Sequence, residues 1–150
     1  FPNATGIGID SSAAALDIAM QNSTSLNLDG RAEFILSEWD TCLEGEFDIV
    51  ISNPPYIPTG ELNSLAPEVA LFEPRLALDG GIDGLAAYRA LAPVFSRRLR
   101  SRGILVIEMG AGQLEAVSQI MAGAGLSNLD YRLDLGGVAR CLVATTLTKR

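Results

Sequence analysis

The sequence contains no histidine and only two cysteines among its 150 residues. Without histidine, the chain cannot provide a serine–histidine or cysteine–histidine pair, or a histidine ligand for a metal. Cys42 and Cys141 stand isolated, in neither a metal-binding nor a disulfide-rich pattern. The chain's own residues therefore suit a reaction that needs alignment of its reactants more than proton transfer, and no metal is expected.

Positive charge is also scarce, with 11 Lys and Arg against 18 Asp and Glu and a net charge of −7. Because basic contacts to phosphate provide most of the affinity for nucleic acids, we expect no independent nucleic-acid binding. No apolar run approaches the roughly 20 residues of a membrane-spanning helix. Hydrophobic residues still make up 48% of the chain, enough for a core. We expect one cytoplasmic domain over residues 1–150, with no membrane partner.

Short apolar runs alternate with segments whose apolar residues recur at helical spacing. This alternation is typical of an α/β domain with a doubly wound, mostly parallel sheet. The turn Gly136-Gly137 predicts that the last two strands form an antiparallel hairpin at one edge. The predicted strands are 5–10, 32–37, 47–52, 103–109, 128–135 and 138–147, the predicted helices are 12–23, 84–101 and 113–124, and residues 54–83 are predicted to be irregular.

The most informative segment is the run at 47–52, which leads directly into Asn53-Pro54-Pro55-Tyr56. Two prolines end the strand and fix the backbone at its carboxyl end, where open α/β sheets bind ligands. The Asn53 side-chain oxygen and the Pro54 carbonyl can accept both N–H bonds of a planar amino group, while Tyr56 covers its face. Its nitrogen then points at an electrophile about 3–3.5 Å away. The alternative is that these residues form only a turn.

This turn resembles the catalytic turn of amino-methyltransferases that use S-adenosylmethionine. Residues 72–85 resemble the segment that follows it in the glutamine N5-methyltransferases of peptide-chain release factors. On the residues alone, 72–85 is a loop with a glycine-rich turn and a cap at Asp83. The resemblance covers about Thr5 to Arg150. It implies a catalytic turn of Asn53, Pro54, Pro55 and Tyr56, and substrate contacts from Asn53, Pro54, Tyr56, Glu73 and Pro74.

The same resemblance implies a cofactor site for S-adenosylmethionine. Residues 8–16 resemble the family's second strand and helix, where the acid, here Asp10, accepts hydrogen bonds from the ribose. Glu38 and Trp39 resemble the adenine-binding segment, and Asn53 borders the cofactor as well. On the residues alone, Asp10 is equally a helix cap, and Trp39 is a packing aromatic.

The resemblance implies a Rossmann-like methyltransferase fold and methyl transfer to the side-chain amide nitrogen of a glutamine in a release factor. Two alternatives remain open. The first is an adenine-N6 DNA methyltransferase, which the acidic composition disfavours. The second is a catalytically inactive fragment that serves only as a folded or interacting domain.

In the resembled family, a glycine-rich turn that carries the methionine part of the cofactor precedes the strand of Asp10. We therefore expect a partial catalytic domain that lacks the first strand and helix and that binds S-adenosylmethionine weakly or not at all. The absent strand belongs between 5–10 and 47–52, so these strands are expected to pair directly or to receive a strand from another chain. The alternative is that the missing residues exist but are disordered or cut away. Glu108-Met109-Gly110-Ala111-Gly112 imitates the missing turn and would imply a permuted enzyme, as among DNA methyltransferases.

Overall fold

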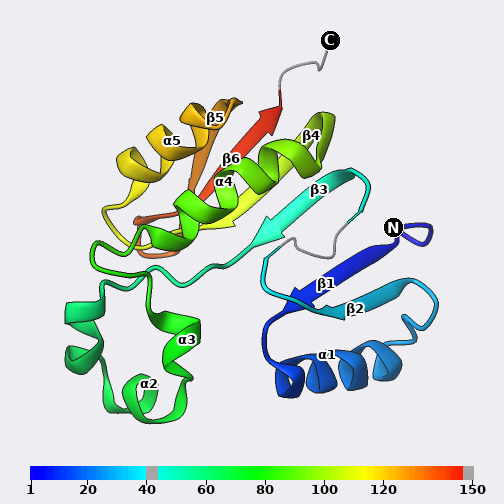
Figure 1. Cartoon of the computed structure of the whole chain (residues 1–150), viewed down its shortest axis with the longest axis horizontal. Coiled ribbons are helices and arrows are strands. Elements are labelled where there is room, and N and C mark those ends of the chain that lie inside the picture. The colour runs from blue at the N-terminus through cyan, green and yellow to red at the C-terminus, as the bar shows by residue number, and fades with distance from the viewer. Residues whose placement is uncertain (40–43, 147–150) are drawn as a thin grey trace. The chain divides into compact units, whose positions relative to one another are not determined.

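The computed structural model describes residues 1–39 and 44–146 (Figure 1). They form two compact units, Phe1–Glu44 and Gly45–Arg150. Cys42 lies outside the described residues. In the described ranges, no helix is both long and apolar enough to cross a membrane.

The first unit is a strand–helix–strand motif of β1 (Gly6–Asp10), α1 (Ala13–Ser25) and β2 (Ala32–Leu36). Helix α1 begins after Ser12, whose hydroxyl accepts a hydrogen bond from the Ala15 N–H at 3.3 Å. A serine at this position satisfies one of the amides that a helix start leaves unpaired. The two strands are parallel, so their carboxyl ends lie at the same edge.

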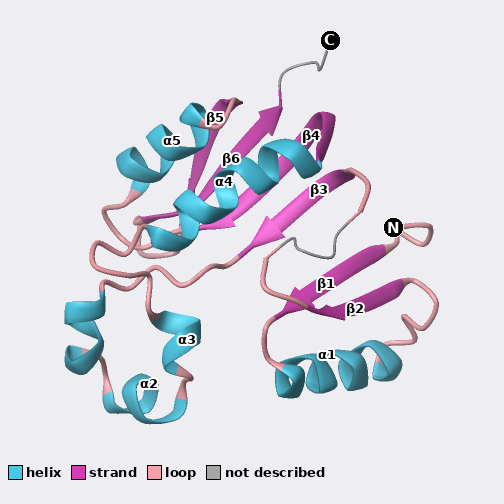
Figure 2. Ribbon diagram, in the orientation of Figure 1, coloured by secondary structure: helices cyan, strands magenta, loops and turns pink. Residues whose placement is uncertain are grey.

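The second unit contains a four-stranded sheet in the order β3-β4-β6-β5 (Figure 2). Strands β3 (Phe47–Ser52) and β4 (Leu99–Glu108) are parallel. Strands β5 (Leu126–Leu133) and β6 (Ala139–Thr146) form the predicted antiparallel hairpin, and β6 also runs antiparallel to β4. The α/β class and the edge position of the hairpin are therefore confirmed.

Strands β1 and β3 belong to two different sheets. The sequence led us to expect that they pair directly or receive a strand from another chain. Within the first unit β1 pairs with β2, and within the second β3 pairs with β4. The expected relation between β1 and β3 stays a prediction. Within the second unit, β3 is an end strand of its sheet.

Helices α4 (Ala86–Arg98) and α5 (Leu114–Gly123) pack on each other and on the sheet (Figure 1). Helix α4 ends before the predicted residue 101, because the chain turns extended at Leu99 and buries that side chain. The predicted apolar stripes of both helices do form the core. Its buried members are Tyr88, Leu91, Ala92, Phe95, Leu99, Leu105, Ile107, Met109, Val117, Met121, Leu126, Leu142 and Ala144.

The segment 54–83, predicted to be irregular, contains three short helices: η1 (Thr59–Ser64), α2 (Pro67–Phe72) and α3 (Arg75–Leu78). Pro67 occupies the first turn of α2, where the fixed φ of proline suits a helix and its missing N–H costs nothing. Helices of four to six residues are too short to show a periodic apolar pattern. This length explains why the sequence did not reveal them.

Candidate active site

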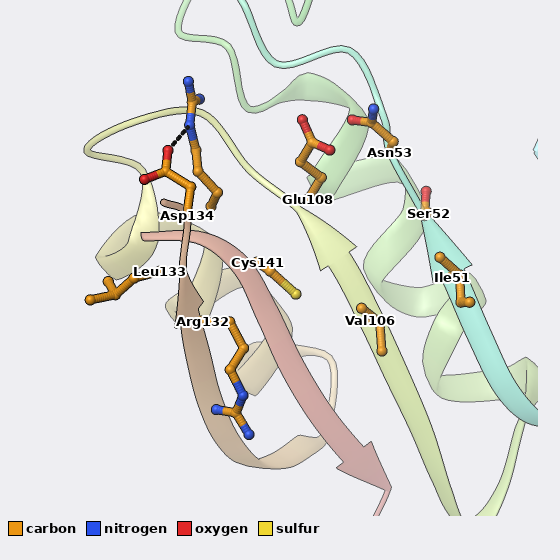
Figure 3. Close-up of a pocket in the computed structure, with 10 residues that line it drawn as sticks. Ile51, Ser52, Asn53, Val106, Glu108, Arg132, Leu133, Asp134 and Cys141 are labelled. Atoms are coloured by element: carbon orange, nitrogen blue, oxygen red, sulfur yellow. Dashed lines mark ion pairs between the residues drawn. The ribbon is translucent and has the colours of Figure 1, made fainter. Parts of the chain in front are cut away.

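The candidate site forms at the carboxyl ends of the parallel strands β3 and β4. Their register places Ser52 opposite Ile107, so the next residues along each chain, Asn53 and Glu108, lie next to each other (Figure 3). Pro54 is buried, whereas Asn53 is exposed. Within the described ranges, no hydrogen bond engages the Asn53 side chain. The turn is therefore anchored by its proline and presents a free amide.

Tyr56 is fixed by the end of the neighbouring strand. Its hydroxyl donates a hydrogen bond to Glu108 Oε1 at 3.1 Å. Burial raises the pKa of Tyr56, and the hydrogen bond to the Glu108 carboxylate raises it further. The phenol therefore stays protonated at neutral pH and remains a donor, which holds the ring beside the turn.

Asn53 borders two hollows of the second unit. The larger, of about 360 Å³, lies on the sheet face opposite the helices and is also lined by Ile51, Val106, Glu108 and Arg140 (Figure 3). The smaller hollow, of about 110 Å³, is lined by Asn53, Pro54, Tyr56, Ile57, Ala77 and Leu78. A group placed in either hollow can reach Asn53, so this residue can face two reactants at once.

Residues 57–59 and 78–81 pair along their backbones and close the smaller hollow. The Ile57 N–H donates to the Leu78 carbonyl at 3.0 Å, and the Ile57 carbonyl accepts from the Gly80 N–H at 2.8 Å. Asp79 joins the same two segments with its side chain, accepting from Thr59 Oγ1 at 2.6 Å and from the Gly81 N–H at 3.0 Å. The Thr59 hydrogen bond is the main reason that the pKa of Asp79 is lowered.

Asp83 lies in the turn that leads into α4, but it does not cap the helix as predicted, because the residue before α4 is Leu85 and no side chain of the described residues caps it. Asp83 Oδ1 accepts a hydrogen bond from the Leu85 N–H at 3.1 Å, and Arg89 forms a bidentate ion pair with the same carboxylate. These contacts, with the Arg89 hydrogen bonds foremost, lower the pKa of Asp83 to about 2. The carboxylate is thus ionised at neutral pH.

The three predicted cofactor residues of the first unit lie at one edge of its sheet. Asp10 ends β1, and Glu38 and Trp39 follow β2; the Ser37 N–H donates to the Asp10 carbonyl at 3.1 Å. Asp10 Oδ1 accepts from the Ser12 N–H at 2.8 Å, while Ser12 itself caps the helix. The helix-cap alternative for Asp10 is therefore wrong, because Asp10 braces the cap residue instead.

Glu73 and Pro74, the other predicted substrate residues, lie exposed between α2 and α3. Neither lines either of the two hollows. The hollow beside Asn53 receives Ala77 and Leu78 of α3 instead. A role for Glu73 and Pro74 in substrate binding stays a prediction.

The segment 108–112 does not act as a second glycine turn open to a ligand. Met109 is completely buried, and the Gly110 N–H already donates to Gln113 Oε1 at 2.9 Å. A cofactor loop needs free amides that point at the ligand. The permuted arrangement therefore has no support in the geometry.

Two curated proteins are similar to this chain over most of its length. A release factor glutamine methyltransferase of Rhodospirillum rubrum is 43% identical over 143 residues, which is 95% of this chain and 44% of the relative. A release factor glutamine methyltransferase of Caulobacter vibrioides is 47% identical over 135 residues, which is 89% of this chain and 47% of the relative. The chain is a relative of the release factor glutamine methyltransferases. It spans about half the length of these curated relatives, and no family model matches it.

Solved structures show that this relative of the release factor glutamine methyltransferases has a methyltransferase fold. A methyltransferase from Pyrococcus furiosus matches 97% of the chain and 64% of its own with a TM-score of 0.68, at 14% identity. A Streptococcus mutans protein solved in complex with SAH matches 95% of the chain and 76% of its own, with a TM-score of 0.60 and 14% identity.

Sequence alone did not identify Gln113, Ala77 and Leu78 as site residues, and noted Glu108 only as part of the imitated glycine turn. Ala77 and Leu78 lie in a helix too short to be recognised. Glu108 carried a usable signal, because it ends the strand next to the one that leads into Asn53. Acidic and polar residues at the carboxyl ends of adjacent parallel strands converge on one edge of a sheet.

Proposed function

We propose that the protein containing this chain transfers a methyl group from S-adenosylmethionine to the side-chain amide nitrogen of a glutamine in a peptide-chain release factor, in the cytoplasm. One observation carries the proposal. The Asn53 side chain stands exposed and without a hydrogen-bond partner in the described residues, at the fixed end of β3, beside the immobilised ring of Tyr56. Similarity to release factor glutamine methyltransferases supports the choice of acceptor.

The turn residues would act by orienting the acceptor amide. The Asn53 side-chain oxygen and the Pro54 carbonyl accept its two N–H bonds, and the Tyr56 ring covers one face. The nitrogen then directs its electrons at the methyl carbon from about 3–3.5 Å. The nitrogen would gain the methyl group as the sulfur–methyl bond breaks, with S-adenosylhomocysteine as the leaving group and one proton released to solvent. The chain's lack of histidine is therefore no obstacle.

The first unit offers groups that fit two parts of S-adenosylmethionine, which would supply the electrophilic methyl group. Asp10 is exposed at the end of β1 and uses Oδ1 for the Ser12 N–H, which leaves Oδ2 to accept from a ribose hydroxyl. Trp39 is 42% exposed and presents a ring on which adenine can pack. Glu38 follows the same strand and would accept from the adenine amino group.

We further propose that residues 1–150 are part of one catalytic domain whose sheet is completed by a strand from the rest of the protein. Ile49 and Ile51 on the end strand β3 are 57% and 77% exposed, which suits a surface that another element covers. The greater length of the relatives supports the same proposal. A glycine-rich turn next to that strand would hold the methionine part of the cofactor.

The deciding experiment uses the full-length natural protein, isotopically labelled S-adenosylmethionine and two acceptors, a release factor and duplex DNA. We expect label in the release factor alone, and mass spectrometry of its peptides should place the methyl group on a glutamine. Changing that glutamine to alanine should abolish incorporation. Label in DNA but not in the release factor would establish an adenine-N6 enzyme instead, and cofactor binding without transfer to either would indicate an inactive domain.

A further inference from the structure

Gln113 occupies the residue before α5, a position that usually favours Ser, Thr, Asp or Asn because their short side chains cap the helix. The Gln113 side chain makes no such cap. It turns away from its own helix toward the end of β4 and the catalytic turn. The amide therefore has another structural task.

All polar atoms of this amide are engaged by segments that meet at the site. Nε2 donates to the Tyr56 carbonyl at 3.0 Å and to the Gly84 carbonyl at 3.4 Å. Oε1 accepts from the Gly110 N–H at 2.9 Å and from the Tyr88 hydroxyl at 3.3 Å. One side chain thus joins the catalytic turn, the start of α4 and the end of β4.

Two glycines provide the space that this amide requires. A Cβ atom on Gly84 would lie 2.7 Å from Gln113 Nε2, and one on Gly110 would lie 2.7 Å from Gln113 Oε1. Both distances are shorter than non-bonded atoms tolerate. Gly84 also has φ of +73°, a conformation that other residues rarely adopt. Both glycines are buried, so the arrangement around Gln113 is packed and specific.

We propose, on the basis of the proposed function, that Gln113 is a positioning residue that holds the catalytic turn through the backbone carbonyl of Tyr56. Tyr56 is then fixed at both ends, because Glu108 accepts from its hydroxyl and Gln113 donates to its carbonyl. Asn53 lies three residues earlier, beyond two prolines that transmit the position of Tyr56 rigidly. Gln113 touches no reactant and acts through this turn.

Gln113→Ala in the full-length protein tests the proposal, with Gln119→Ala, at an exposed position within α5, as the matched control. Misplacing reacting groups by about 1 Å can cost a factor on the order of a hundred in rate. We expect kcat of Gln113→Ala to fall by about tenfold to a hundredfold, with the KM for S-adenosylmethionine within about twofold of wild type. Gln119→Ala should match wild type in both.

Gln113→Glu separates the donor from the acceptor role. The introduced carboxyl can still accept from the Gly110 N–H, but when ionised it cannot donate to the Tyr56 carbonyl. Protonation restores a donor, so the activity of Gln113→Glu relative to wild type should rise as the pH falls toward 5. A general loss of packing would not produce this pH dependence. The activity of the control Gln119→Glu relative to wild type should not change with pH.

Amide hydrogen exchange provides a measurement that does not depend on the acceptor. Gln113→Ala should speed exchange in peptides covering 54–60 and 79–86 by at least about tenfold, and Gln119→Ala should not. If wild type methylates no release factor, the proposed function fails, while this exchange result still decides whether Gln113 holds the turn. Any one of three results would overturn the positioning role. They are a normal kcat in folded Gln113→Ala, unchanged hydrogen exchange in that variant, and an activity of Gln113→Glu relative to wild type that does not change with pH.

Discussion

The two compact units hold their site residues in different ways. In the described part of the first unit, only Leu16 and Ser23 are buried, and both Asp10 and Trp39 are exposed. In the second unit, a hydrogen bond from the Tyr56 hydroxyl to Glu108 and one from Gln113 to the Tyr56 carbonyl fix Tyr56 against a continuous core. From this contrast we expect the exposed carboxylate and ring to contribute to the binding of a ligand. Orientation of reacting atoms instead requires a scaffold that cannot shift.

The largest expected effect concerns the independent folding of each unit. Residues 45–150 contain the core and should unfold cooperatively on heating, whereas a peptide of residues 1–44 should show no transition. Chains of about 40 residues without disulfides or metals rarely bury enough surface to fold alone. Circular dichroism recorded during heating measures whether each of the two pieces unfolds cooperatively. A cooperative transition in the 1–44 peptide would remove the distinction between the units.

The same substitution made in both units should destabilise only one. Met121 is completely buried in the core, while Met20 on α1 is 45% exposed. Met121→Ala should lower the free energy of unfolding by about 2–5 kcal/mol through lost burial and a cavity. Met20→Ala should change it by less than about 0.5 kcal/mol. Denaturant titration of the two variants provides the comparison, and equal losses would contradict it.

Substitutions of the site residues should separate orientation from binding. Asn53→Ala in the full-length protein should reduce kcat by at least about a hundredfold, because the acceptor amide loses its alignment. Asn53→Asp should also be poor, since it adds a charge beside the turn. Asp10→Ala should instead raise the KM for S-adenosylmethionine and leave kcat within about threefold at saturation. Steady-state kinetics with a release factor test this split, and near-normal turnover by Asn53→Ala would remove its catalytic role.

The smallest expected effect is a loosening, in acid, of the segment 57–81, whose ends Asp79 joins. Hydrogen bonds from Thr59 and the Gly81 N–H lower the pKa of Asp79 in the folded protein. A lowered pKa means that this stabilisation is complete above the unfolded value, about 3.9, and is lost as the pH falls through the folded value. Proteolysis of this segment should therefore be constant at neutral pH and accelerate below about pH 4. Asp79→Asn should accelerate proteolysis at neutral pH and weaken this acid dependence, and wild-type cleavage that is the same at all pH values would contradict the role of Asp79.

The regular part of the fold was predictable because its elements are long and strongly patterned. The run 47–52 matches β3 residue for residue, and the hairpin at Gly136-Gly137 forms as expected. The candidate turn was predictable because two prolines after a strand leave little conformational freedom. The contacts of Gln113 were not predictable, because they depend on tertiary packing. The helices α2 and α3 were not predictable either, because they are too short to show a periodic pattern.

The end strand β3 has a further consequence for the behaviour of this chain in solution. An end strand with exposed Ile49 and Ile51 is a template on which another extended segment can add by backbone hydrogen bonds. Asp48 interrupts the apolar run with an exposed charge, anchored to Arg100 at 2.8 Å, and such charges discourage self-association. We therefore expect Asp48 to discourage aggregation through this edge. Its replacement by an apolar residue should favour the addition of strands from other chains.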